Sequence, residues 1–237
     1  NIEVLRDHNY VPVQATQVRA RKEGTLAYAQ HLVAFSHVDD LFNGDRPEII
    51  LYNSHNAKSS LKLFAGFYRM VCSNGLIAGN GFESRMIHYN SSISILEDIL
   101  RDVTVKLPKL HETIDMMKHR DLDGNEVWSI AKEAVKLRWE FLPAVNELDD
   151  LAGSYATEAT INGIIRAKRS EDAGRTLWQV YNRVQENLIR GGAEILSFTD
   201  RNPRGFYRKS KGIRSVNDNL TINRGLWDIA TKEIENV

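Results

Sequence analysis

The chain has 237 residues, of which 42% are hydrophobic, and its 31 Lys/Arg balance its 31 Asp/Glu. This length supports one large domain or two small ones with a proper core. No apolar run approaches the roughly 20 residues that span a bilayer, and no signal segment opens the chain, so we expect a soluble protein with no membrane partner. The single cysteine, Cys72, excludes an intramolecular disulfide and fits a reducing cytoplasm.

The N-terminal segments are predicted to form an antiparallel sheet. A short helix is expected first and then three strand-like segments: residues 2–8, followed by 11–21, 28–37 and 47–53. Side chains of the second segment alternate with the period of two that is typical of a strand. Gly24 and the Asn43-Gly44 pair are turn signals. The pattern therefore predicts a three-stranded antiparallel meander.

A helix is predicted after the meander, over residues 58–72. Its expected apolar stripe follows helical spacing and consists of Leu61, Phe64, Ala65, Tyr68 and Cys72. The sequence Ser73-Asn74-Gly75 is a good C-terminal signal for this helix. Two short strands are expected next, at 75–81 and 82–89.

Beyond Asn90 the chain is predicted to be mostly helical. The expected helices cover 92–119, with a bend or break at Pro108, and then 125–142, 156–166, 172–190 and 220–235. The predicted fold class is α+β: an N-terminal antiparallel β-meander with a helix packed across it, followed by a mostly helical C-terminal region. A boundary near Asn90 divides 1–90 from 91–237, and the absence of a Pro/Gly/Ser-rich linker leaves one continuous domain open.

The zero net charge conceals an asymmetry along the chain. Residues 1–150 carry 17 Lys/Arg against 21 Asp/Glu, whereas residues 151–237 carry 14 against 10. A molecule divided in this way can bind a polyanion with one face, or it can stack head to tail with copies of itself. We therefore expect a homo-oligomer.

The basic segment, residues 201–214 with the sequence RNPRGFYRKSKGIR, has six basic residues, no acidic ones and two adjacent aromatics. Charge and exposed rings on a mobile segment suit a polyanion whose bases can stack. A solvated loop is the alternative. The residues expected to contact nucleic acid are Arg201, Arg204, Phe206, Tyr207, Arg208, Lys209, Lys211 and Arg214.

Two further pairs of arginines are candidates for the same interface. Arg183 and Arg190 lie on the polar side of the predicted 172–190 helix, although an ordinary structural helix would look the same. Its apolar side includes Trp178, which we expect in the core rather than in a base stack. Gly191-Gly192 ends this helix and is expected to free the next segment to move. Arg19 and Arg21 share one strand face, where charge can instead serve to deter edge pairing.

No catalytic or metal-binding motif stands out. The seven histidines follow no ligand pattern, and Cys72 has no cysteine partner. The acidic pair in DLDGNE, Asp121 and Asp123, lacks the later ligands of a calcium loop and predicts a turn. We therefore expect neither enzymatic activity nor a cofactor or metal.

Three blocks of sequence resemble a known family. They are LWQVYNRVQENLIRGG at 177–192, ILYNSHNAKSSLKLFAGFYRMVCSNGLIAG at 50–79 and LTINRGLWDIA at 220–230. They are similar to the phage and plasmid-like proteins known as domain of unknown function 932, and the resemblance covers most of the chain. It implies a bacterial host cytoplasm and brings no established activity, cofactor or catalytic residue. Family members usually have residues upstream, so we expect the chain to be part of a longer protein.

The resulting hypothesis is a non-enzymatic protein of phage or plasmid origin that binds, and in one version anneals, single-stranded DNA in replication or recombination. The order of helix, meander and helix is similar to phage single-strand annealing proteins of the Redβ and Erf type, at the level of fold alone. The alternative function is a counter-defence factor or inhibitor that binds a host protein. Salt-sensitive affinity for oligonucleotides would separate the first function from the second.

Overall fold

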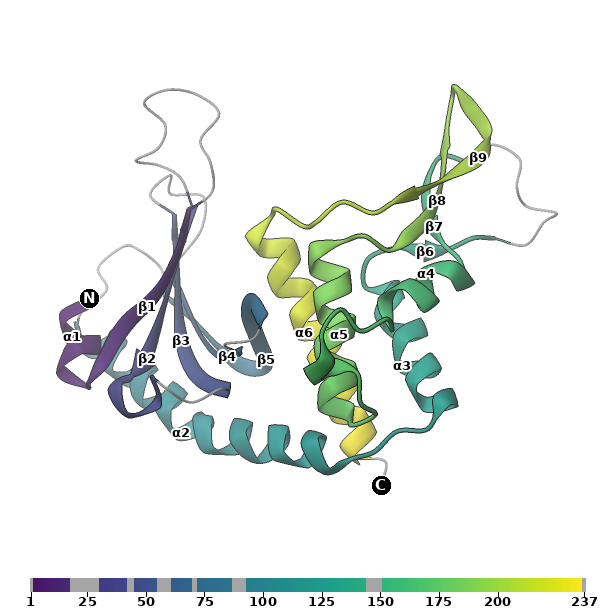
Figure 1. The fold of residues 1–237 in the computed structure, drawn as a ribbon. Coiled ribbons are helices and arrows are strands. Elements are labelled where there is room, and N and C mark those ends of the chain that lie inside the picture. Colours follow the sequence, from purple (N-terminus) through teal and green to yellow (C-terminus); the bar gives the residue numbers. More distant parts are fainter. Residues whose placement is uncertain are drawn as a thin grey trace. The chain divides into compact units, whose positions relative to one another are not determined.

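The structure is a computed structural model, and it describes residues 2–17, 30–41, 45–54, 61–69, 72–86, 93–143 and 151–235. The chain forms two compact units, residues 1–111 and 112–237, whereas the sequence placed a boundary near Asn90. The division falls inside a long helix, α2 (Ile93–His119), which continues through Pro108. Colours from purple to teal mark the first unit in Figure 1, and colours from teal to yellow mark the second.

The first unit contains a five-stranded antiparallel sheet with the strand order β1-β2-β3-β4-β5. A short helix, α1 (Ile2–Asp7), precedes it, and the one-turn helix η2 (Val38–Asp40) follows β2. The strands are β1 (Tyr10–Gln17), β2 (Gln30–His37), β3 (Asp45–Ser54), β4 (Leu61–Arg69) and β5 (Cys72–Met86). Ala34, Phe35, Ile49 and Ile50 are buried in this unit. The predicted α+β class and the predicted meander of the first three strands are confirmed.

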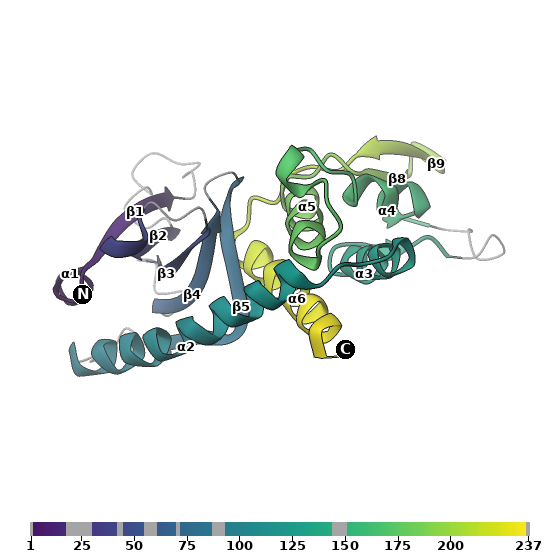
Figure 2. The same ribbon diagram turned by 60° about the horizontal axis from the view of Figure 1, so that its bottom comes forward.

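The helix predicted over residues 58–72 is wrong, because Leu61–Arg69 is strand β4. This strand pairs with β3 on one side and with β5 on the other. The apolar run LKLFAGFYR fits a period of two as well as a helical stripe, and its aromatic content favours a strand. Pairing with β3 and β5 favours the strand over the helix for these residues. The helix that lies beside this sheet in Figures 1 and 2 is α2.

The second unit combines helices with a four-stranded sheet that the sequence did not predict. Its helices are α3 (Gly124–Lys136), α4 (Glu158–Ile164), η4 (Ser170–Asp172), α5 (Leu177–Arg190) and α6 (Val216–Glu235). The sequence predicted all of them except η4, but it placed the end of α3 too late, at 142, and the start of α5 too early, at 172. Its strands are β6 (Glu140–Phe141), β7 (Gly153–Ala156), β8 (Glu194–Thr199) and β9 (Asn202–Lys209). They lie in the order β6-β7-β8-β9, and β6 and β7 are parallel while the other pairs are antiparallel.

Helix α5 is the centre of the second unit, with neighbours α3, α4, η4 and α6. Thr176 caps its first turn, and Gln179 completes a reciprocal capping box. Every residue from Val180 to Ile189 is buried. The polar side of this helix, which the sequence assigned to Arg183 and Arg190, is buried at Arg183 and also at Asn182 and Glu186.

The buried polar side chains of α5 hold neighbouring segments in place. Asn187 donates from Nδ2 to the carbonyl oxygens of Ile164 and Arg166, at 2.9 Å each. Gln185 donates from Nε2 to Asn223 Oδ1 of α6 at 2.6 Å. Because a buried polar group without a hydrogen bond is costly, these contacts explain how polar residues are tolerated inside the core.

None of the helices that the structure describes is both long enough and apolar enough to cross a bilayer.

Candidate nucleic-acid interface

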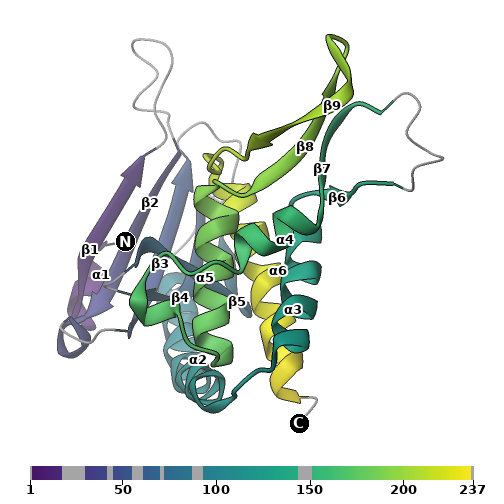
Figure 3. The same cartoon turned by 45° about the vertical axis from the view of Figure 1, so that its right-hand side comes forward.

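Most of the basic segment is a strand, whereas the sequence predicted a mobile segment with a solvated loop as the alternative. Residues 202–209 form β9, which pairs with β8 and with no other described strand, so it is the edge strand of its sheet. Figure 3 shows the β8–β9 hairpin extending beyond the helices of the second unit. Arg201 precedes β9, and residues 210–214 of the segment lead from β9 toward α6.

A glycine shapes the middle of the hairpin. The pairing of β8 and β9 shifts register between Ser197 and Thr199, as in a β-bulge. Gly205 has a φ of 76°, and a Cβ at this position would lie 2.9 Å from the ring of Phe198. The same ring makes an edge contact with Tyr155, at 5.9 Å between centroids. Gly205 therefore allows Phe198 to cover the backbone of the edge strand.

Gly191 and Gly192 allow the segment after β9 to pack closely against the end of α5. Gly191 ends α5 with a φ of 77°, and a Cβ there would lie 2.5 Å from the carbonyl oxygen of Ser210. Three backbone hydrogen bonds join the two segments: Gly192 N to Ser210 O, Ser210 N to Ala193 O and Ile213 N to Ile189 O, at 2.8 to 2.9 Å. The prediction that Gly191-Gly192 ends the helix is confirmed, whereas the prediction that it frees the next segment is wrong.

The two aromatic residues of the segment lie on opposite faces of β9. Phe206 is 39% exposed and Tyr207 is 57% exposed. Consecutive residues of a strand point to opposite faces, so Phe206 shares a face with Arg208 while Tyr207 shares the other with Lys209. The two rings thus cannot form one continuous stacking platform.

Arg208 is the best-anchored cation of the segment. Its Nε donates to Ser197 Oγ at 2.7 Å, and its Nη2 donates to Ser154 Oγ at 2.9 Å. The guanidinium of Arg138 lies close enough for the positive charge of Arg208 to act on it. Burial lowers the pKa of Arg138, and the positive charge of Arg208 lowers it further. The sequence reading missed Arg138, which follows the end of α3.

Five other cations of the basic segment are exposed, and the described part of the chain gives none of them an ion pair: Arg201, Arg204, Lys209, Lys211 and Arg214. Glu194 of β8 is opposite Lys209 in the strand register. Arg190 is 40% exposed at its side chain and lies 3.6 Å from Glu186, which also pairs with Arg169 at 3.0 Å. The structure thus brings the predicted cations together along one edge, with Arg190 partly engaged elsewhere.

Arg183 does not belong to this surface. It is 8% exposed, and its Nη1 donates to the carbonyl oxygens of Asp172 and Gly174 at 2.9 and 2.6 Å. Burial lowers its pKa, and the charge of Asp172 acts in the opposite direction. Its observed role is to hold the turn before α5. Arg19 and Arg21 lie outside the described residues.

No group of three or more His, Cys, Asp or Glu side chains able to hold a metal ion is found within the described ranges. The acidic segment DLDGNE has a structural role: the Asp123 carboxylate caps α3 by accepting hydrogen bonds from the backbone N–H groups of Asn125 and Glu126, at 2.8 Å each. The segment is the start of a helix and not the turn that the sequence predicted, because residues 124–126 already belong to α3.

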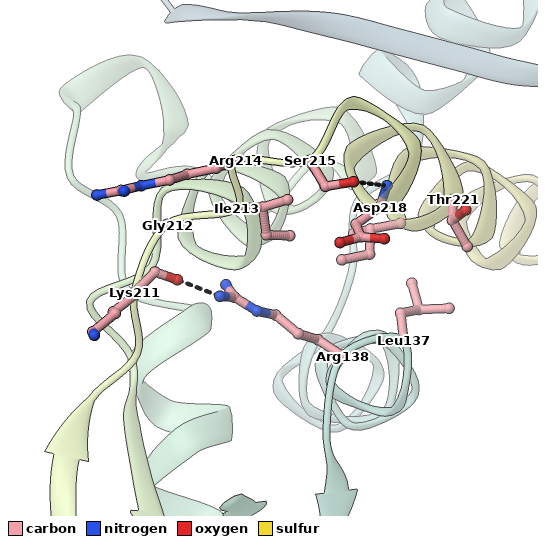
Figure 4. Close-up of a pocket in the computed structure, with 10 residues that line it drawn as sticks. Leu137, Arg138, Lys211, Gly212, Ile213, Arg214, Ser215, Asp218 and Thr221 are labelled. Atoms are coloured by element: carbon pink, nitrogen blue, oxygen red, sulfur yellow. Dashed lines mark hydrogen bonds between the residues drawn. The ribbon is translucent and has the colours of Figure 1, made fainter. Parts of the chain in front are cut away.

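A pocket of about 660 Å³ adjoins the basic segment. Its walls are the end of α3 with Leu137 and Arg138, residues 211–215, and the first turns of α6 (Figure 4). Arg138 donates hydrogen bonds to the carbonyl oxygens of Leu188 and Lys211, which fixes its guanidinium at the pocket wall. Its guanidinium carbon also lies 4.5 Å from the centre of the Trp139 ring.

Comparison with known proteins shows which family the chain belongs to. The family model described as "Domain of unknown function (DUF932)" matches residues 2–227, so the chain belongs to this family. Two similar proteins are the UPF0380 proteins YafZ and YfjQ of Escherichia coli strain K12. Each is 28% identical over 230 residues, which cover 97% of this chain and 78% of the relative. No solved structure matches the chain significantly.

Proposed function

We propose that this protein binds single-stranded DNA without catalysing a covalent reaction, and that β9 with residues 210–214 is the binding surface. One observation carries the proposal: the exposed cations of the basic segment lie on the edge strand β9 or next to it in the chain, and no described residue neutralises them in an ion pair. A cluster of exposed cations without ion-pair partners is the electrostatic footprint of a polyanion site.

The dimensions of β9 suit a strand of phosphates. An eight-residue strand spans about 26 Å at roughly 3.3 Å per residue, which is enough for several nucleotides. Arg201 and Arg204 lie toward the turn of the hairpin, and Lys209, Lys211 and Arg214 continue the row toward α6. The backbone of the DNA would follow this edge.

The exposed rings favour single strands over duplex DNA, because only unpaired bases offer their faces for stacking. Stacking on an aromatic side chain contributes roughly 1–3 kcal/mol per base and tolerates any sequence. Tyr207 is the more exposed ring and shares its face with Lys209. We therefore assign the main stacking contact to Tyr207, with Phe206 serving bases that cross to the other face.

The biological setting is proposed from the sequence blocks that resemble phage and plasmid proteins. A protein of mobile-element origin that binds single strands in a bacterial cytoplasm fits replication or recombination. Annealing of complementary strands would follow if several copies assemble on one strand.

The test is fluorescence anisotropy with a labelled oligo(dT) at several salt concentrations. Replacing Arg201, Arg204 and Lys209 with Ala should weaken binding and reduce the slope of log K against log salt by about 2, since each lost phosphate contact removes roughly 0.7. These three side chains make no hydrogen bond or ion pair with any described residue, so the variant should fold normally.

A matched control removes three exposed cations elsewhere: Arg101, Arg175 and Lys232. This variant has the same net charge as the first and should keep the wild-type salt slope. If both variants lost the same DNA affinity, the effect would come from the overall charge of the protein and not from the basic segment. Absence of any binding at low salt, together with capture of one host protein, would replace the proposal with the inhibitor function.

A further inference from the structure

The pocket beside the basic segment has a volume of about 660 Å³, within the range of roughly 300–1,000 Å³ that is usual for small-molecule sites. Its contributing segments are distant in sequence. Arg138 is held there by carbonyl groups 50 and 73 residues away, at Leu188 and Lys211. A wall assembled from three separate elements is a fixed feature of the second unit.

Charge is divided between the two sides of residues 211–215, with the charged ends of Lys211 and Arg214 pointing away from Asp218. Figure 4 shows the side chains of Lys211 and Arg214 extending to one side of their segment, while Asp218 and Thr221 lie on the opposite side. Arg138 projects between the two sides. A guanidinium has five N–H donors. Arg138 uses two of them for hydrogen bonds to the carbonyl oxygens of Leu188 and Lys211, so the other N–H groups remain for a ligand.

The carboxylate at the other side excludes a simple anion as the preferred occupant. Asp218 makes no ion pair with a described residue, and only its backbone N–H is engaged locally, with Ser215 Oγ at 3.2 Å. A carboxylate repels phosphate but accepts hydrogen bonds from N–H donors. Leu137 and Ile213 add apolar surface between the two ends.

A ligand for this pocket therefore needs an anionic end, a flat apolar middle and an edge with N–H donors. A nucleotide has all three in that order. We infer that the pocket receives one nucleotide, with its phosphate toward Lys211 and Arg214 and its base beside Leu137 and Ile213. The donor edge of the base faces Asp218. Guanine, which presents two adjacent N–H donors to one carboxylate, is the preferred base.

This inference rests on the proposed function, because Lys211 and Arg214 belong to both surfaces. The same nucleotide chemistry can come from a free mononucleotide or from one nucleotide of a bound strand. Thymine, whose single N–H lies between two carbonyl oxygens, should fit poorly beside a carboxylate.

Calorimetric titration of the whole chain with dGMP, dTMP and inorganic phosphate tests the pocket. We expect dGMP to bind about tenfold or more tightly than dTMP, as for a base read by two hydrogen bonds. Phosphate alone should bind more weakly than either nucleotide. Asp218→Asn should remove the preference for dGMP, while Glu235→Gln, which makes the same charge change at the other end of α6, should leave it intact.

A second variant covers the case in which Asp218→Asn disturbs the start of α6. Thr221→Trp places a large side chain at an exposed position of the pocket wall and should abolish dGMP binding with little effect on folding. Equal affinity for dGMP, dTMP and phosphate would overturn the inference, and so would a preference that survives both variants. If dGMP does not bind while oligo(dT) still does, the pocket assignment fails and the proposed function stands. If dGMP binds while oligo(dT) does not, the proposed function fails.

Discussion

Tyr181 lies at the middle of the buried face of α5. It stacks on Trp178 at 5.7 Å with nearly parallel rings and makes an edge contact with Trp227 of α6 at 6.1 Å. No described residue gives its hydroxyl group a hydrogen bond. Burial raises the pKa of the Tyr181 phenol well above its ordinary value, and the negative charge of Asp228 raises it further.

The raised pKa predicts a loss of stability at alkaline pH. Below about pH 10 the phenol is protonated in both states, so it contributes no pH dependence. Above that pH the unfolded chain ionises while the folded chain keeps its proton, and the free energy of unfolding falls as pH rises. Tyr181→Phe should flatten this decline and raise stability at neutral pH by about 1 kcal/mol, because it removes a buried hydroxyl without a partner. Denaturant unfolding of both proteins between pH 7 and 11 measures this; parallel curves would contradict it.

Trp178 and Tyr207 provide a contrast between core and surface aromatics. Trp178 is 4% exposed, so Trp178→Ala should lower the free energy of unfolding by about 3–5 kcal/mol. Tyr207→Ala should change stability by no more than about 0.5 kcal/mol and should instead weaken DNA binding. Chemical denaturation and anisotropy separate the two effects. A Trp178→Ala variant that melts like wild type would show that the ring is not needed by the core.

At the scale of elements, the end of α5 depends on its terminal glycine. Gly191 combines a φ of 77° with a ψ of −163°, a region that is essentially reserved for glycine. Gly191→Ala also directs a methyl group against the Ser210 carbonyl, so we expect a loss of at least about 2 kcal/mol. Gly124→Ala, where a Cβ meets open space at the start of α3, is the control and should be neutral. Thermal melting compares them; equal melting temperatures would disprove the requirement.

The elements differ in how much of them the sequence could predict. Helices α3 to α6 follow from their apolar periodicity. Strand β9 does not, because Pro203, Gly205 and the charges conceal its period of two. The run at 61–69 fits both periods, and only its pairing with β3 and β5 decides. The buried polar side chains of α5 and the placement of Arg138 depend on partners far along the chain, such as Asn223 and Lys211, which no local pattern reveals.

At the scale of the whole molecule, the charge asymmetry does not coincide with the two units. Residues 1–111 carry 12 Lys/Arg and 11 Asp/Glu, and residues 112–237 carry 19 and 20. Within the second unit, residues 112–150 carry 5 Lys/Arg against 10 Asp/Glu, whereas 151–237 carry 14 against 10. The division of charge therefore lies inside the unit that holds the candidate interface.

This arrangement leads us to predict self-association. The acidic stretch of one copy can contact the basic segment of the next, and a head-to-tail contact of this kind makes a ring or a filament. Association should weaken between 0.1 M and 1 M salt, as the screening length falls from roughly 10 Å to 3 Å. Light scattering measures the mass. A 27.0 kDa monomer at every salt concentration, with and without DNA, would remove both the oligomer and the annealing hypothesis.

The hydrogen bonds between residues 210–213 and residues 189–193, at and just after the end of α5, link occupancy of the basic segment to folding of the core. Residues 210–213 cannot move away from the end of α5 without breaking these backbone hydrogen bonds. Ligand binding should then raise the melting temperature of the second unit as a whole. At a ligand concentration of 100 times Kd the stabilisation amounts to about 2.7 kcal/mol. Occupied and empty proteins would consequently differ in how long they survive proteases inside a cell.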